Sequence, residues 1–463
     1  MDSAELVFAG IAEQARMVRD GEVSSRELVQ ACLERIGTLD PRLNAWRIVL
    51  ADRALAEADQ ADARRGAGDT RPLLGVPIAV KDDIDVGATT TAWGSAATGP
   101  EVARDAACVV RLREAGAVVL GKTSVPELTV WPFTETRTFG ATRNPWDPSR
   151  SPGGSSGGTG AAVASGMVGA ALGSDGGGSI RIPAAWCGLF GIKPTRGLVS
   201  MEPHTDAWQG LSVNGPLARS VADGALLLDA LAESKPERPF ADAVRPPERR
   251  LKIAISSRKL PGQLPFPKLD AECRAALDHT ASALRALGHE VVELDPDYGA
   301  GLFPHFLARY LRGIKDDADK LPHPERLEPR TRGMARLGAA WPSAAVERFR
   351  RGEAAVRERI WRSLDGADLL MTPSVAQLPP EIGRWEGRGA LLTLNGVAGF
   401  VPYNAAFNVT GDPAVNVPAG FSRAGLPLGV QIVAPHHGEH TLISVAAELE
   451  EARPWADARP PIS

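Results

Sequence analysis

The chain has 463 residues, of which 44% are hydrophobic and 23% are charged, an ordinary globular composition that excludes disorder and supplies a large core. Its formal net charge is −4 at pH 7 and its basic residues are scattered among acidic ones, which excludes nucleic acid as a partner. The start MDSAELVFAG lacks the features of a signal peptide, and no later run reaches the ~20 apolar residues of a membrane span. We therefore expect a cytoplasmic protein with no membrane partner.

The cysteines and histidines predict no metal centre. The four cysteines, Cys32, Cys108, Cys187 and Cys273, lie far apart without a CxxC pair, which favours reduced, partly buried thiols. The eight histidines begin at His204 and form no HExxH pattern. A metal-dependent hydrolase therefore has little support in this sequence.

Helices are expected first along the chain. Ser24 and Glu27 form a capping box before apolar residues at helical spacing, and an alanine-rich helix is expected near 51–65. Gly75 to Val80 then predicts a short buried strand that ends at Lys81. Beyond it, strands and helices alternate as in a mostly parallel sheet, with strands expected at 117–120, 251–256, 290–294, 367–371, 414–418 and 428–433, and helices near 105–115, 270–287, 343–363 and 439–451.

This alternation predicts one α/β domain over residues 1–463, in which a large, twisted, mostly parallel mixed sheet is covered by helices on both faces. Prolines and charges dominate 234–250, which indicates a surface connection, and a similar stretch at 318–343 is expected to wrap the surface or border the active site. The domain then comprises N-terminal helices, a core with the glycine-rich motifs, and a second half with further strands, helices and the substrate pocket, at residues 1–70, 71–233 and 251–452.

A formal phosphate-loop pattern runs from Gly116 through Gly121-Lys122-Thr123. Its four intervening residues, Ala-Val-Val-Leu, favour a strand rather than a loop. Pro126 follows where a helix should continue. The match is therefore interpreted as a coincidence.

A second pattern, Gly153-Gly154-Ser155-Ser156-Gly157, satisfies the GxSxG rule for the nucleophile elbow of a serine esterase. The preceding residues 144–152 contain three prolines, which is not compatible with the buried strand that an elbow needs. A downstream histidine has no assigned place. The elbow therefore stays as a minor alternative.

A third interpretation takes 151–181 as one unit: Ser-Pro-Gly-Gly-Ser-Ser-Gly-Gly, a helix of small residues, and then Gly-Ser-Asp-Gly-Gly-Gly-Ser-Ile-Arg. This segment resembles the signature of the amidase signature family, with Ser155 and Ser179 separated by the family spacing of 24 residues. The resemblance covers nearly the whole chain, through GVPIAVKD at 75–82, GKT at 121–123, NPW at 144–146, CGLFGIKP at 187–194, FNVTGDP at 407–413 and LPLGVQ at 426–431.

The residue types suit amide chemistry without a histidine. A serine hydroxyl becomes a nucleophile only when a base takes its proton. A lysine can serve if its site disfavours the ammonium, because its ordinary pKa of ~10.4 is too high for a base at neutral pH. Lys81 at the end of an apolar strand fits this requirement, although a structural salt bridge to Asp82 or Asp83 is the alternative.

The resemblance assigns roles to the catalytic serines and lysine. It implies that Ser179 attacks the carbonyl and that Ser155, on a cis peptide bond, relays the proton to Lys81 and later to the departing amine. It also implies that Ser156 supports the relay and that Asp175 and Arg181 hold the nucleophile loop as an ion pair.

The backbone N–H groups of Gly176, Gly177, Gly178 and Ser179 are expected to form the oxyanion hole, because residues without side chains let adjacent amides turn inward. Many family members carry a larger residue at the position of Gly176. Its absence here is expected to loosen the hole.

Thr129, Val130, Trp131 and Phe133 follow the GKT strand, where the family places part of its acyl pocket, so an aromatic or bulky apolar acyl group is one expectation. Ordinary core packing explains Trp131 and Phe133 equally well. Sequence alone therefore leaves the acyl pocket undecided.

The sequence thus predicts a cofactor-free amidohydrolase that cleaves a small-molecule carboxylic amide or a related hydrazide or carbamate, with a homodimer left open. A rival is the amidase subunit of a glutamine-dependent tRNA amidotransferase. Against it, TVWPFT at 129–134 lacks the small Met-Gly-Ser-type segment of those subunits. A catalytically inactive, ligand-binding relative is opposed by the intact Lys81, Ser155 and Ser179.

Overall fold

The computed structural model describes residues 2–234, 236–263 and 268–463. Its N-terminal part is helical, as expected, and the predicted capping box of Ser24 and Glu27 is present at the start of the third helix. A short strand, β1, lies between the third and fourth helices and was not expected. The elements are α1 (Ser3–Phe8), α2 (Ile11–Asp20), α3 (Ser25–Leu43), β1 (Trp46–Val49) and α4 (Ala51–Gly66).

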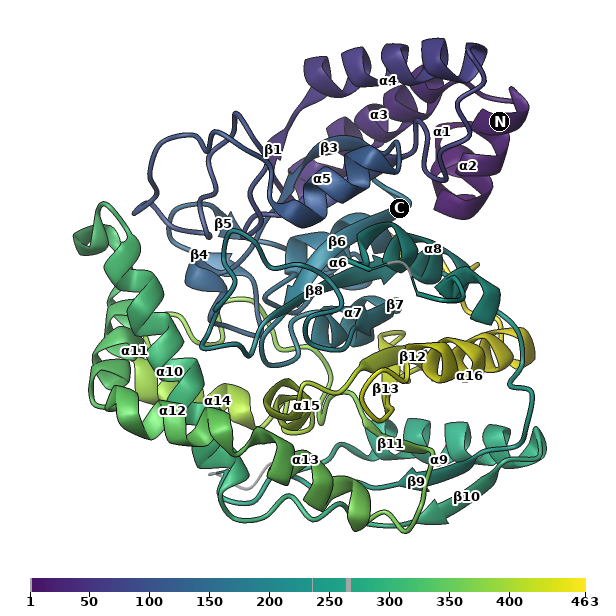
Figure 1. Cartoon of the computed structure of the whole chain (residues 1–463). Coiled ribbons are helices and arrows are strands. Elements are labelled where there is room, and N and C mark those ends of the chain that lie inside the picture. The colour runs from purple at the N-terminus through teal and green to yellow at the C-terminus, as the bar shows by residue number, and fades with distance from the viewer. Residues whose placement is uncertain (1, 235, 264–267) are drawn as a thin grey trace.

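A mixed sheet of eleven strands forms the centre of the described chain (Figure 1). Its strand order is β1-β3-β2-β6-β8-β7-β12-β13-β11-β9-β10. Every strand expected from the sequence is present, with ends shifted by a few residues. The strands after β1 are β2 (Pro77–Lys81), β3 (Val118–Thr123), β6 (Ala170–Asp175), β7 (Phe190–Lys193), β8 (Val213–Ala218), β9 (Lys252–Ile255), β10 (Glu290–Glu293), β11 (Leu369–Pro373), β12 (Ala414–Phe421) and β13 (Pro427–Val433).

The α/β class and the mixed sheet are confirmed, but the expected dominance of parallel pairs is corrected. Parallel pairing is confined to β3-β2-β6 and β11-β9-β10, whereas the strands between these blocks pair antiparallel. The sequence prediction missed β6, β7 and β8 because their glycines and Pro216 are poor strand formers. Pro216 is tolerated because β7 pairs only with Leu217 and Ala218, which leaves Pro216 opposite β6 alone.

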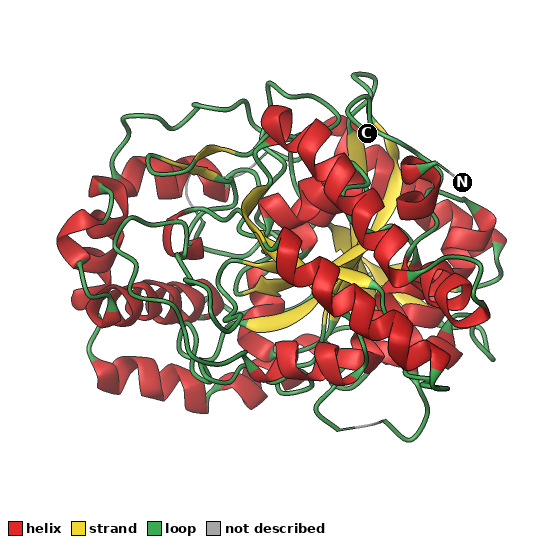
Figure 2. Cartoon of the chain, turned by 90° about the horizontal axis from the view of Figure 1, so that it is seen from above, coloured by secondary structure: helices red, strands yellow, loops and turns green. Residues whose placement is uncertain are grey.

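Helices cover both faces of the sheet, as Figure 2 shows, and each face has its own apolar core. Side chains alternate between the faces, so Ile78 and Val80 of β2 join one core and Ala79 joins the other. The first core packs against α5 (Ala107–Glu114), α8 (Val221–Leu231), α9 (Ala271–Ala286) and α16 (Glu439–Ala452), and the second against α3, α4, α6 (Gly157–Ala164) and α7 (Arg181–Cys187).

A further group of helices gathers on one side of the molecule, away from α3 and α4 (Figure 1). The stretch 318–343, expected to wrap the surface or border the active site, contains the end of α10 and all of α11, whose apolar positions recur at helical spacing. The single helix expected at 343–363 is divided at Gly352. The group comprises α10 (Leu302–Lys320), α11 (Pro329–Ala339), α12 (Ser343–Arg351), α13 (Glu353–Arg362) and α14 (Ala390–Ala398), followed by α15 (Ala405–Thr410).

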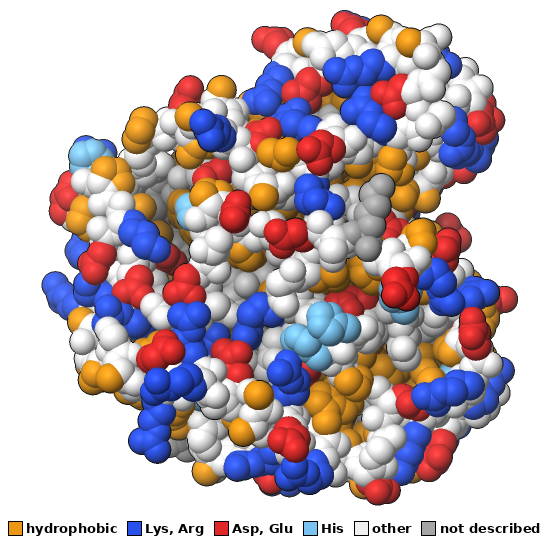
Figure 3. All heavy atoms as spheres, viewed as in Figure 1, with side chains coloured by type: hydrophobic (Ala, Val, Ile, Leu, Met, Phe, Trp, Pro, Cys, Tyr) orange, Lys and Arg blue, Asp and Glu red, His pale blue; other side chains and the backbone are white. Residues whose placement is uncertain are grey.

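The surface carries basic and acidic side chains interspersed on the face seen in Figure 3. Within the described ranges, no helix has the length and apolarity to cross a membrane. The same ranges contain no cluster of three His, Cys, Asp or Glu side chains that could hold a metal ion.

Candidate active site

Two parallel neighbours in the sheet bring the predicted site together. Lys81 is the last residue of β2 and Asp175 the last of β6, and these strands pair in parallel through Ala79 with Ala171 and Val80 with Leu172. The carboxyl ends of parallel strands meet at one edge of a sheet, where α/β proteins place their chemistry. The two motifs, distant in sequence, therefore meet at this edge.

Lys81 contacts Ser155, as predicted. The Lys81 side chain has no exposed surface, and its Nζ donates hydrogen bonds to Ser155 Oγ and to Ser174 Oγ, both at 2.7 Å. It also forms an ion pair with Asp83 at 3.2 Å. The alternative of a salt bridge is therefore half right, because the Asp83 pair exists alongside the contact with Ser155. Asp82 instead pairs with Lys122, at 3.0 Å.

The charge balance at Lys81 favours a base. Burial lowers the pKa of Lys81 from its ordinary value, and the Asp83 carboxylate opposes that shift without cancelling it. Because Asp82 is engaged by Lys122 and Arg47, its charge is compensated elsewhere. Lys122 lies in strand β3, in agreement with rejecting the phosphate-loop pattern.

Ser155 lies in a tightly enclosed loop before α6. The Gly154–Ser155 peptide bond is cis, as the resemblance implied. A side chain at Gly154 would place its Cβ 2.4 Å from the carbonyl oxygen of Trp131, so this backbone position admits only glycine. Residues 144–152 form no strand, which contradicts the nucleophile elbow.

Ser156 connects the two serine loops. Its N–H donates to the carbonyl of Ser179 at 3.2 Å, and its hydroxyl donates to the carbonyl of Ser174 at 3.1 Å. The loop of Ser155 is thereby held against the loop of Ser179. The supporting position expected for Ser156 agrees with these contacts.

The predicted ion pair of Asp175 and Arg181 is present and wholly buried, with two hydrogen bonds of 2.9 Å. Burial opposes ionisation of Asp175, but the Arg181 guanidinium outweighs it and holds the pKa of Asp175 well below its ordinary value. Asp175 also accepts hydrogen bonds from the N–H groups of Gly178 at 2.7 Å and Ile180 at 3.1 Å. The carboxylate thus determines the path of the loop that carries Ser179.

These contacts divide the expected oxyanion donors. The N–H of Gly178 is directed to Asp175, which leaves Gly176, Gly177 and Ser179 as the donors not engaged in this way. The space beside Gly176 is not empty, because a Cβ there would lie 2.6 Å from the ring of Trp208. The expected loosening at Gly176 is therefore offset by packing against Trp208.

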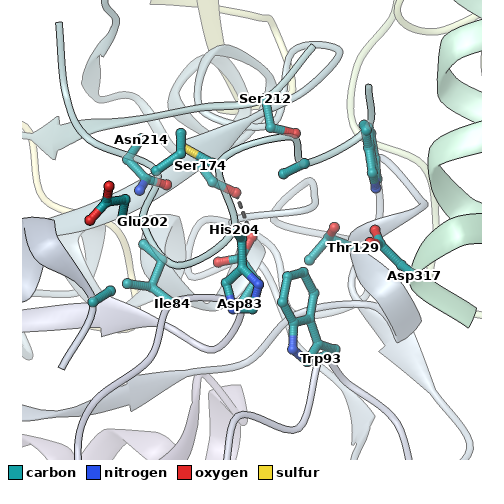
Figure 4. Close-up of a pocket in the computed structure, with 14 residues that line it drawn as sticks. Asp83, Ile84, Trp93, Thr129, Ser174, Glu202, His204, Ser212, Asn214 and Asp317 are labelled. Carbon is teal, nitrogen blue, oxygen red and sulfur yellow. Dashed lines mark hydrogen bonds between the residues drawn. The ribbon is translucent and has the colours of Figure 1, made fainter. Parts of the chain in front are cut away.

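A cavity of about 280 Å³ opens beside Ser179, which is 8% exposed. Val130 and Trp131, two of the residues considered for the acyl pocket, line this cavity. Phe133 does not line it and stacks behind Trp131 with ring centroids 5.9 Å apart. Thr129 lines a separate small cavity, which Ser174 also lines (Figure 4).

The sequence placed the substrate pocket in the second half of the chain, at 251–452, but did not name most of the residues of the cavity wall. Most of the wall comes from Trp208 and from α10 and α14, whose lining residues are Phe303, Phe306, Leu307, Tyr310, Leu391, Leu394, Asn395, Val397 and Ala398. The recurrence of Phe303, Phe306, Leu307 and Tyr310 at helical spacing is a readable signal for an apolar helix face. That signal does not identify the element that the face meets.

The comparisons with known proteins agree with this geometry. A family model described as Amidase matches residues 27–443. A Mycobacterium tuberculosis protein named as the amidase AmiB2 is 51% identical over 464 residues, covering 100% of both chains. The 6-aminohexanoate-cyclic-dimer hydrolase of Paenarthrobacter ureafaciens is 36% identical over 96% of this chain and 95% of its own.

A solved structure gives the same assignment from the fold. The structure of a 6-aminohexanoate cyclic dimer hydrolase with its substrate superposes with a TM-score of 0.87 at 32% identity, over 98% of this chain and 99% of that one. Sequence, fold and the arrangement at the edge of the sheet lead to one assignment. The chain belongs to the amidase signature family, as an amide-hydrolysing enzyme.

Proposed function

We propose that the enzyme hydrolyses carboxylic amides, and related hydrazides or carbamates, through an acyl-enzyme on Ser179, with Lys81 acting through Ser155 as the base. The observation that carries this proposal is the 2.7 Å contact from a buried lysine of lowered pKa to Ser155, in a loop tied to that of Ser179. A lysine whose pKa is lowered by burial loses its proton more readily, and in its neutral form it can accept a proton from serine.

Each step balances in protons. Ser179 Oγ attacks the carbonyl carbon as its proton passes to Ser155, whose own proton passes to Lys81. The reverse transfer protonates the amine nitrogen as the C–N bond breaks, which leaves the acyl group on Ser179. Water then enters in place of the amine and attacks the acyl carbon as it gives a proton to the same relay. The relay returns that proton to Ser179 Oγ as the ester bond breaks and the carboxylic acid is released.

The oxyanion is stabilised by backbone dipoles in this mechanism. The N–H groups of Gly176, Gly177 and Ser179 supply the donors, and the N–H of Gly178 instead holds the loop on Asp175. The buried pair of Asp175 and Arg181 then has a positioning role. No cofactor or metal enters a step.

The acyl group is proposed to be bulky and largely apolar, because the cavity beside Ser179 is lined mainly by aromatic and aliphatic side chains. Trp131 contributes directly to that wall, whereas Phe133 supports Trp131 from behind. Gln263 Oε1 is buried in this wall without a hydrogen-bond partner among the described residues. A donor on the acyl group would satisfy it.

Relatives named as an amidase and as a 6-aminohexanoate-cyclic-dimer hydrolase favour hydrolysis over the amidotransferase alternative. Purification without copurifying partner chains would agree with this choice. A stable complex with other subunits, combined with no turnover of simple amides, would favour the amidotransferase.

The test is to trap the acyl group. A panel of aryl and alkyl amides, hydrazides, carbamates and esters first identifies a substrate, which is then turned over with hydroxylamine present. We expect the hydroxamate product, and mass spectrometry should locate the acyl adduct on Ser179. An adduct on Ser155 would contradict the assignment of the nucleophile.

A further inference from the structure

Lys81 has a second set of partners on β6 and the turn after β2. Ser174 Oγ accepts from Lys81 Nζ at 2.7 Å and donates to Asp83 Oδ2 at 2.5 Å, so it bridges the lysine and the carboxylate. Asp83 Oδ2 also lies 3.2 Å from Lys81 Nζ. Figure 4 shows the Ser174–Asp83 bond as a dashed line. Lys81 Nζ is thereby held by Ser174 and Asp83 together, in addition to its contact with Ser155.

The remaining oxygen of Asp83 has no partner. Asp83 Oδ1 is buried without a hydrogen bond among the described residues, and so is Asn214 Oδ1. The Asn214 amide is oriented by Nδ2, which donates to the carbonyl of Ser200 at 3.3 Å. Two buried acceptors without donors are costly unless a further group satisfies them.

Both residues line one small cavity of about 20 Å³, shown in Figure 4. A cavity of ~10–15 Å³ or more holds one water if polar partners surround it. A water has two O–H donors, which matches two acceptors that lack partners. The cavity is too small for a substrate-sized molecule.

We propose that Asp83 is a positioning residue for Lys81, and that a single water in this cavity donates to Asp83 Oδ1 and Asn214 Oδ1 to complete that pair. The inference rests on the proposed role of Lys81 as base. The pair holds Nζ toward Ser155, and its negative charge sets the pH at which Lys81 loses its proton.

Several other ionisable groups face this pair and are not in contact with Lys81. His204 lies 3.3 Å from Asp85 and, with Glu202 and Asp317, lines the same cavity. Further ionisable groups near the pair are Asp175 and Cys108. Asp83 is the carboxylate paired directly with Lys81, so its removal should act more strongly than any of these.

The test compares D83N with D85N, which removes the same charge from the same turn at a residue bonded to Thr91 instead of Lys81. The readout is kcat/KM against pH for an amide identified in the substrate panel. Removing the carboxylate destabilises the ammonium, so the acid limb for D83N should move to lower pH by about 1 to 3 pH units. The acid limb of the pH profile for D85N should not shift.

The outcomes separate the inference from the mechanism. A uniform loss of kcat/KM at every pH, with the acid limb unmoved, would make Asp83 a structural residue while leaving Lys81 as the base. An adduct on Ser155, or full activity in K81A, would overturn the mechanism itself.

The water has an independent test that needs no variant of Asp83. A high-resolution crystal structure of the wild-type enzyme should show density between Asp83 Oδ1 and Asn214 Oδ1, within hydrogen-bond distance of both. N214L, which fills the cavity, should lose that density and move the acid limb. An empty cavity in the wild type would overturn the water site.

Discussion

The catalytic edge of the sheet and the acyl cavity are built in opposite ways. At the edge, Lys81, Ser174, Asp175 and Arg181 are buried, and each is held by directional hydrogen bonds or ion pairs. The cavity is lined mainly by apolar side chains of α10 and α14, and Leu391 remains 58% exposed at it. At the edge, many hydrogen bonds and ion pairs fix the positions of the side chains. In the cavity, the shape of the apolar wall determines what fits.

This contrast predicts different responses to substitution. A change at the edge leaves a buried charge or polar group without its partner, which is costly. A change in the cavity removes contact area, which alters binding by a smaller and more gradual amount. The expected effects below test this difference.

The largest effect is expected at Lys81. K81A should reduce amide hydrolysis by ~10² to 10⁴-fold more than hydrolysis of a matched activated ester, because an amine cannot depart as an anion and a phenolate can. The measurement is kcat/KM for an anilide and a nitrophenyl ester of the same acid. Equal losses for both substrates would limit Lys81 to assisting attack.

A substitution of Asp175 tests the catalytic edge through its effect on the free energy of unfolding. D175N should lower the free energy of unfolding by ~3–5 kcal/mol, because it leaves Arg181 buried without a compensating charge. Urea denaturation at pH 7 measures the change. The control is D59N in the exposed pair with Arg26, where a loss of ~0–1 kcal/mol is expected. Similar losses for the two variants would contradict the expected difference between the buried and the exposed ion pair.

A substitution of Lys193 tests the same region through the pH dependence of stability. Burial lowers the pKa of this lysine to about 7. Above that pH the folded state carries it neutral while the unfolded state remains charged, so stability should rise by ~1.4 kcal/mol per pH unit from about 7 toward 10. K193M removes this dependence and should be the more stable protein near pH 7.

The measurement is the difference in unfolding free energy between wild type and K193M across that pH range. A difference that does not change with pH would contradict the lowered pKa. K320M, at a side chain that is 74% exposed, serves as the control and should change stability little.

The smallest effect is expected in the cavity. L394A should raise KM for a bulky acyl amide by roughly tenfold with little change in kcat, because the lost contact exists in both ground and transition states. A short acetyl amide should respond little. A matching fall in kcat would show that the cavity also positions the reacting carbonyl.

The sequence predicted the catalytic residues where they stand in short local motifs. Ser155 and Ser179 stand in short glycine-rich motifs whose glycines are required by the close approach of backbones, and Lys81 ends an apolar strand. The structure brings Lys81 and Ser155 into contact. Ser174 stood in the same motif and received no role, because nothing in the pattern shows that its hydroxyl bridges Lys81 and Asp83.

The rest depended on contacts between distant segments. Strands β6 to β8 have poor intrinsic propensity and form because neighbouring strands flank them within a buried sheet. The apolar face of α10 is visible in the sequence, but its contact with the loop of Ser179 depends on connections whose geometry the pattern does not contain. Of the residues expected in the acyl pocket, Val130 and Trp131 therefore line the cavity, and Thr129 and Phe133 do not.

Trp208 belongs to both regions, because its ring fills the space beside Gly176 in the nucleophile loop and also lines the acyl cavity. A smaller residue at 208 would widen the cavity and also remove support from the loop, whereas a side chain at 176 would displace the indole. Substitutions at these two positions should therefore change substrate range and turnover together. In directed evolution, residues 176 and 208 should therefore be varied together. Libraries that vary only one of them would contain mostly impaired enzymes.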